Sequence, residues 1–218
     1  MCGRYALKLL ADVLELPFVE ESEFPAIELP WTHFNVCPGT VAPVVDKHGV
    51  LRPALWGLIP HWSKEARPKR PLFNARLETA ATRSSFRMAW SKQRCVVPAS
   101  GFYEWSDLSG RREPYFVPPE QDSSLLWLAG LASHFTAPDG ETRWSYAILT
   151  EDSQGSTVEP YHDRRPVALT CAEIPAWLHS EDPPGARSKL GPPYMVSSKV
   201  NVAAVNEPSN LQPVAQEK

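Results

Sequence analysis

Residues 125–150, LLWLAGLASHFTAPDGETRWSYAILT, contain two strongly β-like stretches, 125–135 and 144–150. Both are rich in the apolar, aromatic and β-branched residues that favour strands. Shorter stretches of the same character occur on either side, at 41–45, 50–58, 94–97, 101–105, 114–117 and 166–170. Because 114–117 contains a proline, we expect it at a sheet edge.

Helical patterns in the chain are few and short. Apolar residues at every third or fourth position predict an amphipathic helix over 7–16, and residues 77–90 lack Pro and Gly. A third helix is expected over 172–179, and the 23 prolines argue against long elements. The pattern predicts an α+β fold: a single domain over 1–218 with a curved, barrel-like, mostly antiparallel β core and flanking short helices. We expect a loosely ordered tail over about 208–218.

Composition excludes several classes of protein. The chain has 43% hydrophobic and 22% charged residues, which is typical of a globular protein. It has no apolar run of the length that spans a membrane. The first 18 residues do not resemble a signal peptide, because Lys8, Asp12 and Glu15 interrupt their apolar stretch. We therefore expect a cytoplasmic protein, associated with the nucleoid if the source is bacterial.

The four cysteines show no CxxC or zinc-site spacing; they are Cys2, Cys37, Cys95 and Cys171. We therefore expect free thiols, no metal and no cofactor. Cys95 and Cys171 are expected in the core, because free cysteine is among the most buried residue types. Nothing in the sequence indicates a second partner surface, so we expect a monomer.

Positive charge is concentrated in one window, although the chain as a whole carries −3. Residues 61–94 contain nine Lys or Arg and two Glu, a net +7, and the rest of the chain carries −10. Aromatic residues are interleaved with these charges, including Trp62 and Trp90. This mixture suits a surface that follows a nucleic-acid backbone and stacks bases. The alternative is a solvated helix face beside a basic loop.

Cys2 offers a chemistry that no other residue in the chain offers. A small second residue favours removal of Met1, which would leave Cys2 with a free α-amine beside its thiol. Such a 1,2-aminothiol condenses with an aldehyde: the amine forms a Schiff base and the thiol closes a thiazolidine ring. Both groups titrate at about 8 to 8.5, so both are partly available near neutral pH. The alternative is a small residue that simply follows Met1.

Three further polar clusters could take part in chemistry, and each has a structural alternative. Asn74 precedes a predicted helix and could instead cap it. Glu104 lies among aromatic residues on a short strand, where an apolar setting would raise its pKa and suit it to proton transfer. Its alternative role is a pair with a surface arginine. His162 lies beside an acid and two arginines and could be a general acid or base, or sit in a turn.

Taken together, six segments in order carry a family resemblance. They are MCGRY (1–5), NVCP (35–38), WGLIP (56–60), NARLET (74–79), GFYEW (101–105) and HDRRP (162–166). With these motifs, residues 2 to about 206 resemble the SOS response-associated peptidase (SRAP) family, also called abasic-site processing proteins.

The resemblance implies one curved β-barrel-like core with a positively charged DNA channel. It also implies that mature Cys2 attacks the ring-opened aldehyde of an abasic site in single-stranded DNA and forms a thiazolidine cross-link, which protects the lesion. By the same resemblance, Asn74 would orient the Cys2 amine or the sugar. Glu104 would move protons in Schiff-base formation and ring closure. His162 would protonate the sugar ring oxygen.

The resemblance also implies a set of DNA-binding residues. Arg4 and Arg76 would hold flanking phosphates, as guanidinium groups can. Thr150 matches a family position near the site. The full expected set of DNA-binding residues is Arg4, Arg76, Thr150, Trp62, Trp105 and Arg164. The two tryptophans are our own candidates for stacking or wedging bases, and the alternative is a place in the core.

Two other functions remain open on the sequence. The first is a cysteine peptidase, acting on itself or on others, with Cys2 as an N-terminal nucleophile and Glu104 and His162 as its partners. The second is a non-catalytic binder of single-stranded DNA that uses the basic window. Metal-dependent hydrolysis has no support, because no ligand spacing is present.

Overall fold

The computed structural model describes residues 2–9, 16–22, 31–63, 72–120, 125–180 and 189–214. Five strands of one sheet close on themselves, because β11 pairs with β5 as well as with β10. The order around this barrel is β5-β4-β7-β10-β11, and all its pairings are antiparallel except β5 with β11. Its strands are β4 (Val41–Val45), β5 (Val50–Trp56), β7 (Arg94–Ala99), β10 (Leu126–Thr136) and β11 (Thr142–Asp152).

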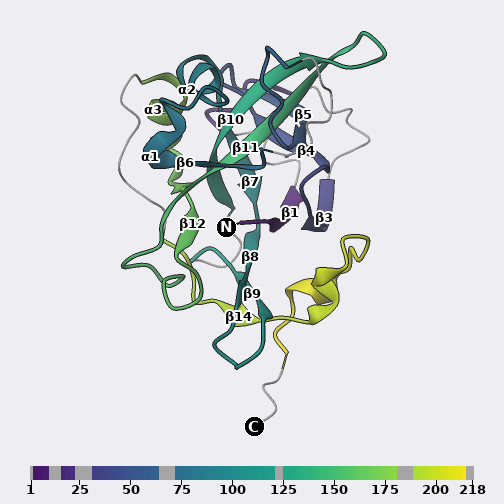
Figure 1. The fold of residues 1–218 in the computed structure, drawn as a ribbon, viewed down its shortest axis with the longest axis vertical. Coiled ribbons are helices and arrows are strands. Elements are labelled where there is room, and N and C mark those ends of the chain that lie inside the picture. Colours follow the sequence, from purple (N-terminus) through teal and green to yellow (C-terminus); the bar gives the residue numbers. More distant parts are fainter. Residues whose placement is uncertain are drawn as a thin grey trace.

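A second, five-stranded sheet lies below the barrel in Figure 1, in the order β14-β9-β8-β1-β3. Its strands are β1 (Arg4–Leu9), β3 (Trp31–Val36), β8 (Gly101–Ser106), β9 (Glu113–Val117) and β14 (Tyr194–Met195). The chain passes from the barrel into this sheet where β7 is followed by β8. Gly101 stands at this switch, and a Cβ there would lie 2.3 Å from the Phe116 ring, so the close approach requires glycine.

Short elements complete the described fold. The remaining strands are β2 (Glu21–Ser22), β6 (Asn74–Arg76), β12 (Arg164–Pro166) and β13 (Ala168–Leu169). The α-helices are α1 (Leu77–Ala80), α2 (Arg87–Lys92) and α3 (Ile174–His179), and the 3₁₀ helices are η3 (Cys171–Glu173), η4 (Ser198–Asn201) and η5 (Pro208–Leu211). The three α-helices cover one side of the barrel (Figure 1).

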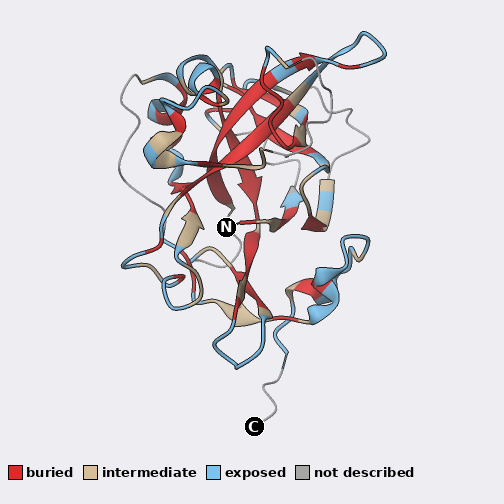
Figure 2. Cartoon of the chain, in the orientation of Figure 1, coloured by how far each residue is buried: buried red, intermediate tan, exposed pale blue. Residues whose placement is uncertain are grey.

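The core fills the barrel and continues to its junction with the second sheet. Figure 2 shows the barrel strands and β8 as mainly buried. At the junction Trp56 packs between Tyr5 and Tyr146, at ring-centroid distances of 5.1 and 6.2 Å. The Tyr5 and Tyr146 hydroxyls share a buried hydrogen bond of 2.7 Å. The start of β1 is therefore held by ring contacts and a hydrogen bond within the buried core.

The predicted fold class is confirmed: the core is curved, barrel-like and mostly antiparallel, with short flanking helices. Several predicted elements are wrong in detail. Residues 7–9 of the predicted 7–16 helix belong to β1, because pairing with β3 overrides their helical periodicity, and residues 10–15 lie outside the described part. The predicted 77–90 helix is two helices, since Thr82, Ser84 and Ser85 favour turns between them.

Two further expectations need correction. The strand at 114–117 is not at an edge, because β9 pairs with β8 on one side and β14 on the other. Cys95 is buried as predicted, but Cys171 is exposed at the start of η3.

Asn210 is fully buried in η5, so the loose tail remains a prediction only for residues beyond this helix. Within the described residues, no helix combines the length and hydropathy that a membrane span requires.

Candidate active site

Cys2 is fully buried, two residues before β1 begins. Its backbone carbonyl accepts a 2.7 Å hydrogen bond from Asn74 Nδ2, and its Sγ lies 3.7 Å from the Arg4 carbonyl oxygen. Burial raises the pKa of the Cys2 thiol far above its usual value, and the nearby Glu104 charge raises it further. The thiol is therefore protonated at neutral pH and needs a proton acceptor before it can act as a nucleophile.

Asn74 opens β6, whose parallel pairing with β11 places it beside Ile148. Its Nδ2 donates to the Cys2 carbonyl, whereas its Oδ1 is buried with no hydrogen-bond partner among the described residues. A buried acceptor without a partner is costly and is typical of a functional site. The helix-capping alternative is wrong, because Arg76 is the N-cap of α1 and no side chain caps that helix.

Glu104 lies on β8 with only 2% of its surface exposed. Burial raises its pKa to about 7, and the positive charge at the amino terminus opposes this rise. The sequence-based expectation of a raised pKa is thus confirmed, and the alternative of a surface pair is wrong. A carboxyl with this pKa is present in both protonation states near neutral pH, so it can accept a proton and return it.

His162 faces Glu104, with its Nε2 4.0 Å from Glu104 Oε2. Its Nδ1 lies 2.9 Å from the backbone nitrogen of Arg164, which donates to it, and 2.8 Å from Asp163 Oδ1. The lowered pKa of His162 is caused mainly by burial, with the positive amino terminus acting in the same direction. The neutral ring is therefore favoured at pH 7. His162 does lie in a turn, as the structural alternative held, and this turn brings it to Glu104.

Arg4, two residues after Cys2, is part of a polar network. Its guanidinium donates to Asn35 Oδ1 and to the Asn201 carbonyl, both at 2.9 Å. It also lies 5.9 Å from the centre of the Trp105 ring, and Trp105 Nε1 donates to Asn201 Oδ1 at 2.7 Å. Asn35 is fully buried, and its Nδ2 faces three backbone carbonyls of residues 200–205. This network joins β1, β3, β8 and η4 beside Cys2.

The remaining expected DNA-binding residues differ in exposure and in their hydrogen-bond partners. Arg76 is exposed and pairs with the fully buried Thr150 across β6 and β11. Arg164 is engaged with Glu78 and with the Thr150 carbonyl. Trp62 is 59% exposed, as a base-stacking residue requires. The DNA-binding role of each of these residues stays a prediction.

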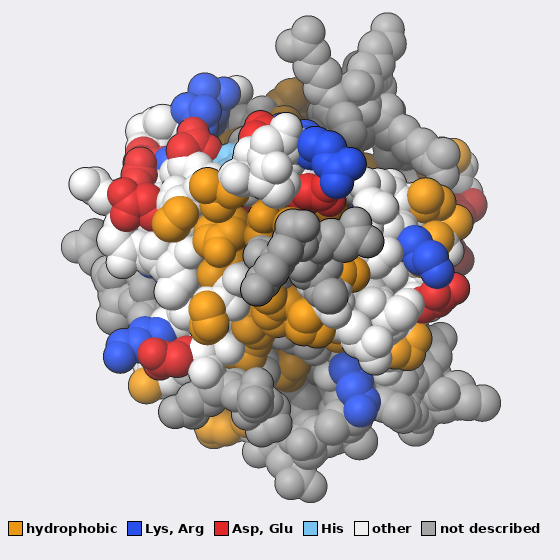
Figure 3. Space-filling model, turned by 90° about the horizontal axis from the view of Figure 1, so that it is seen from below, with side chains coloured by type: hydrophobic (Ala, Val, Ile, Leu, Met, Phe, Trp, Pro, Cys, Tyr) orange, Lys and Arg blue, Asp and Glu red, His pale blue; other side chains and the backbone are white. Residues whose placement is uncertain are grey.

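The basic window does not form one surface in the described structure. Arg94 is mostly buried, where its guanidinium lies 5.4 Å from the Trp177 ring centre and donates to the Ser180 carbonyl. Arg83, Arg87 and Lys92 are exposed on and before α2, while residues 64–71 of the window lie outside the described part. The end view from the β9–β14 side shows Lys and Arg scattered around the rim, with hydrophobic side chains gathered at the centre (Figure 3).

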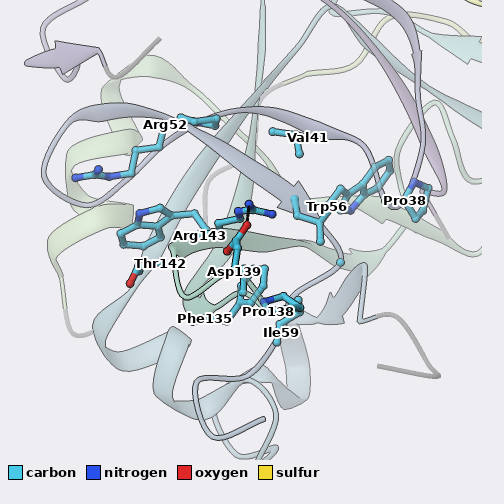
Figure 4. A pocket seen from close by; sticks show the side chains of 16 residues that line it. Pro38, Val41, Arg52, Trp56, Ile59, Phe135, Pro138, Asp139, Thr142 and Arg143 are labelled. Carbon is cyan, nitrogen blue, oxygen red and sulfur yellow. Dashed lines mark hydrogen bonds and ion pairs between the residues drawn. The ribbon is translucent and has the colours of Figure 1, made fainter. Parts of the chain in front are cut away.

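A groove with a volume of about 1640 Å³ lies elsewhere. It follows β5 and the end of the β10–β11 hairpin, and Figure 4 shows Arg52, Trp56, Phe135 and Arg143 around it. Its lining includes none of Cys2, Asn74, Glu104 and His162. We place the candidate site at these four residues because their chemistry converges there, and groove size alone carries no chemistry. The described residues contain no group of three or more side chains placed to hold a metal ion.

Four separate segments thus bring a cysteine thiol, an amide, a buried carboxyl and an imidazole to one place. The family model "SOS response associated peptidase (SRAP)" matches residues 1–208. The chain belongs to this family. The sequence-based recognition is therefore confirmed.

Three curated relatives carry the same kind of name. The chain is 31% identical to abasic site processing protein YoqW of Bacillus subtilis, over 97% of this chain and 99% of that protein. It is 31% identical to abasic site processing protein YedK of Escherichia coli, over 83% and 81%. It is also 31% identical to abasic site processing protein HMCES of Mus musculus, over 82% of this chain and 64% of that protein.

Two crystal structures resemble the fold. A protein from Bacteroides thetaiotaomicron matches with a TM-score of 0.82 at 22% identity, over 98% of this chain and all of that chain. A protein from Bordetella bronchiseptica matches with a TM-score of 0.70 at 26% identity, over 90% of this chain and all of that chain. The first of these likenesses concerns the fold alone.

The sequence did not single out three residues that the structure brings to the site. Asn35 and Asn201 hold Arg4, and Glu78 holds Arg164. Asn35 and Glu78 lie inside the quoted motifs NVCP and NARLET. Their place in these motifs is the one signal that could have pointed to them.

Proposed function

We propose that this protein senses abasic sites in single-stranded DNA and captures them covalently through mature Cys2, as a thiazolidine. The observation that carries the proposal is the convergence of Cys2, Asn74 and Glu104, with His162 4.0 Å from the Glu104 carboxylate. The names of the curated relatives support the same lesion as the target.

The first step is Schiff-base formation, after Met1 has been removed. The Cys2 amine adds to the aldehyde carbon of the ring-opened sugar, and the carbinolamine loses water to give the imine. This step needs a proton delivered to the departing oxygen. Glu104, with a pKa of about 7, supplies that proton in its acid form. Asn74, whose Nδ2 already binds Cys2, orients the amine or the sugar with its free Oδ1.

The second step closes the ring. The Cys2 sulfur adds to the imine carbon, the thiol proton leaves, and the nitrogen gains a proton. The raised pKa of the Cys2 thiol makes a nearby base necessary, and Glu104 in its carboxylate form is that base. One aldehyde and one aminothiol thus give one thiazolidine and one water. His162 protonates the sugar ring oxygen from its imidazolium form, which its lowered pKa makes the minor form at pH 7, and so promotes the ring opening that exposes the aldehyde.

The expected DNA contacts come from two groups of residues. Arg4 and Trp105 lie within the polar network, and Arg76 is exposed on β6, which begins at Asn74. Arg76 and the exposed Trp62 would bind phosphate and stack a base. We propose that the protein acts as a monomer in the cytoplasm, near the nucleoid in a bacterial cell.

The peptidase alternative has less support from the site. Cysteine peptidases need a thiolate, which a lowered thiol pKa provides. Here burial raises the pKa of the Cys2 thiol, so the sulfur is a poor nucleophile until a Schiff base has formed beside it.

The proposal is tested by comparing abasic DNA that has the aldehyde with abasic DNA that lacks it. We expect a heat-stable DNA–protein adduct with single-stranded DNA that carries one abasic site, measured on a denaturing gel. The same DNA after borohydride reduction has an alcohol in place of the aldehyde and should give none. Equal adduct with both DNAs would contradict the proposal. Cleavage of fluorogenic peptides in the absence of DNA would instead favour the peptidase.

A further inference from the structure

One residue near the C-terminus contacts two of the residues expected to bind DNA. Asn201 is the last residue of η4, in the yellow part of the chain in Figure 1, and it is exposed. Its backbone carbonyl accepts a 2.9 Å hydrogen bond from Arg4 Nη2, and its side-chain Oδ1 accepts one of 2.7 Å from Trp105 Nε1. The Arg4 guanidinium lies 5.9 Å from the centre of the Trp105 ring. The three residues therefore form a closed triangle of contacts.

The triangle is formed on the strands that carry two of the catalytic candidates. Arg4 follows Cys2 by two residues and opens β1, and Trp105 directly follows Glu104 on β8. Pairing of β1 with β8 aligns the two backbones. It does not fix the direction of long side chains, which rotate about several bonds. The contacts with Asn201 supply that direction for Arg4 and Trp105.

A buried asparagine anchors the segment that carries Asn201. Asn35 on β3 is fully buried, and its Oδ1 accepts a 2.9 Å hydrogen bond from Arg4 Nη1. Its Nδ2 faces three backbone carbonyls on either side of Asn201, at 3.2, 3.0 and 2.8 Å from those of Val200, Val202 and Val205. Because a buried amide that loses its partners is strongly destabilising, this anchor holds the segment firmly. The backbone at Asn201 is therefore fixed independently of the Asn201 side chain.

The triangle presents two groups that suit a nucleic-acid strand. Arg4 is half-buried, and a guanidinium has more N–H donors than the bonds to Asn35 and Asn201 use, so donors remain for a phosphate oxygen. Trp105 is also half-buried, which leaves part of its ring available to a base or a sugar. A side chain that is already held in its bound orientation loses less freedom on binding, and this strengthens the complex.

We propose that Asn201 is a positioning residue for DNA binding: it holds Arg4 and Trp105 in the orientation in which they contact the strand that carries the abasic site. Arg4 and Trp105 touch the DNA, and Asn201 acts through them. This inference rests on the proposed function, because it takes single-stranded DNA as the partner. The six motifs that carry the family resemblance do not include Asn201.

The test is the Kd for intact single-stranded DNA, measured for Asn201→Ala, Trp105→Phe and the double variant. Asn201→Ala removes the side-chain acceptor and keeps the backbone carbonyl that binds Arg4. We expect it to weaken binding by about fivefold, the effect of one lost hydrogen bond. Trp105→Phe removes the donor of the same bond, so adding Asn201→Ala to Trp105→Phe should weaken binding by less than about 1.5-fold. The abasic DNA concentration that gives half the maximal cross-linking rate should rise with the Kd.

Two further variants serve as references in the same assay. Ser198 is exposed at the other end of η4, and Ser198→Ala should leave the Kd within about 1.5-fold of wild type, as most surface substitutions do. Arg4→Gln removes a phosphate contact, so it should reduce the salt slope of the Kd by about 0.7. Asn201→Ala should leave this slope unchanged, because Arg4 keeps its charge.

Two results would overturn the inference. One is an unchanged Kd in Asn201→Ala. The other is a loss that persists in full when Asn201→Ala is added to Trp105→Phe, since Asn201 would then act without Trp105. Where melting temperatures show that Asn201→Ala fails to fold, Trp105→Phe alone must weaken binding by about fivefold or more, or the inference fails.

Failure of the proposed function has a separate readout. Absence of any adduct from a wild-type protein that binds single-stranded DNA would overturn the covalent reaction, and the Kd comparison would still decide the role of Asn201. A wild-type protein that does not bind single-stranded DNA at all would overturn both.

Discussion

Replacing Cys2 by serine is expected to reduce the heat-stable adduct by about 100-fold or more, as loss of an essential nucleophile does. Serine keeps a small second residue, so Met1 is still removed and the amine is still free. The amine forms the imine, but no sulfur closes the ring. The adduct should therefore appear only when borohydride is added during the reaction, which traps the imine. The measurement is a denaturing gel of both reactions side by side.

Cys37 supplies the matched control for this result. It is a half-buried free thiol directly after β3, the strand that pairs with β1, and its Sγ lies 3.2 Å from the Asn35 carbonyl oxygen. Cys37→Ser should leave the heat-stable adduct within about twofold of wild type, since removal of a group outside the chemistry leaves the rate nearly unchanged. A full yield of heat-stable adduct from Cys2→Ser would refute the thiazolidine mechanism.

Replacing Glu104 by glutamine is expected to slow cross-linking by about 100-fold, the usual contribution of one general acid–base group. The pH dependence should change as well. In the wild-type protein the rate should pass through a maximum near pH 7, because Schiff-base formation uses the acid form of Glu104 and ring closure uses its carboxylate form. The glutamine variant should lose this maximum and keep only the rise with pH that deprotonation of an α-amine produces. The measurement is the single-turnover rate from pH 5.5 to 8.5.

The melting temperature of the Glu104→Gln variant at two pH values is the control for this prediction. Because burial raises the Glu104 pKa, the folded state holds this proton more tightly than the unfolded state does. The carboxyl therefore favours folding below its unfolded pKa, and this contribution is lost as pH rises toward about 7. Glu104→Gln should raise the melting temperature at pH 8 and have little effect at pH 4. A variant that is both slower and less stable at pH 8 would argue for a structural role.

Much of the fold could be predicted from local pattern. The 125–135 and 144–150 stretches become β10 and β11, because their aromatic and apolar residues suit a buried sheet. Predictions from local pattern were wrong where pairing between strands distant in sequence determines the secondary structure. Residues 7–9 have helical periodicity but pair with β3 as a strand. No sequence signal shows that β11 pairs with β5 in parallel and closes the barrel.

The part of the candidate site that could be predicted is the part whose chemistry follows from residue type alone. The aminothiol of Cys2 and the apolar setting of Glu104 can be inferred from the chain alone, and the raised pKa of Glu104 confirms that setting. The partners of the arginines could not be inferred. Arg164 pairs with Glu78, 86 residues away in the sequence, and Arg4 donates to the Asn201 carbonyl, 197 residues away. Only the folded structure shows which partners these arginines bind.

The central claim is that the mature amino-terminal cysteine closes a ring on the lesion. Its most direct test is the intact mass of the purified protein, before and after reaction with single-stranded DNA that carries one abasic site, followed by peptide mapping. The account predicts a protein that lacks Met1 and an adduct equal to protein plus DNA minus one water, located on Cys2. An adduct located on another residue, or no adduct from a folded protein that lacks Met1, would contradict it.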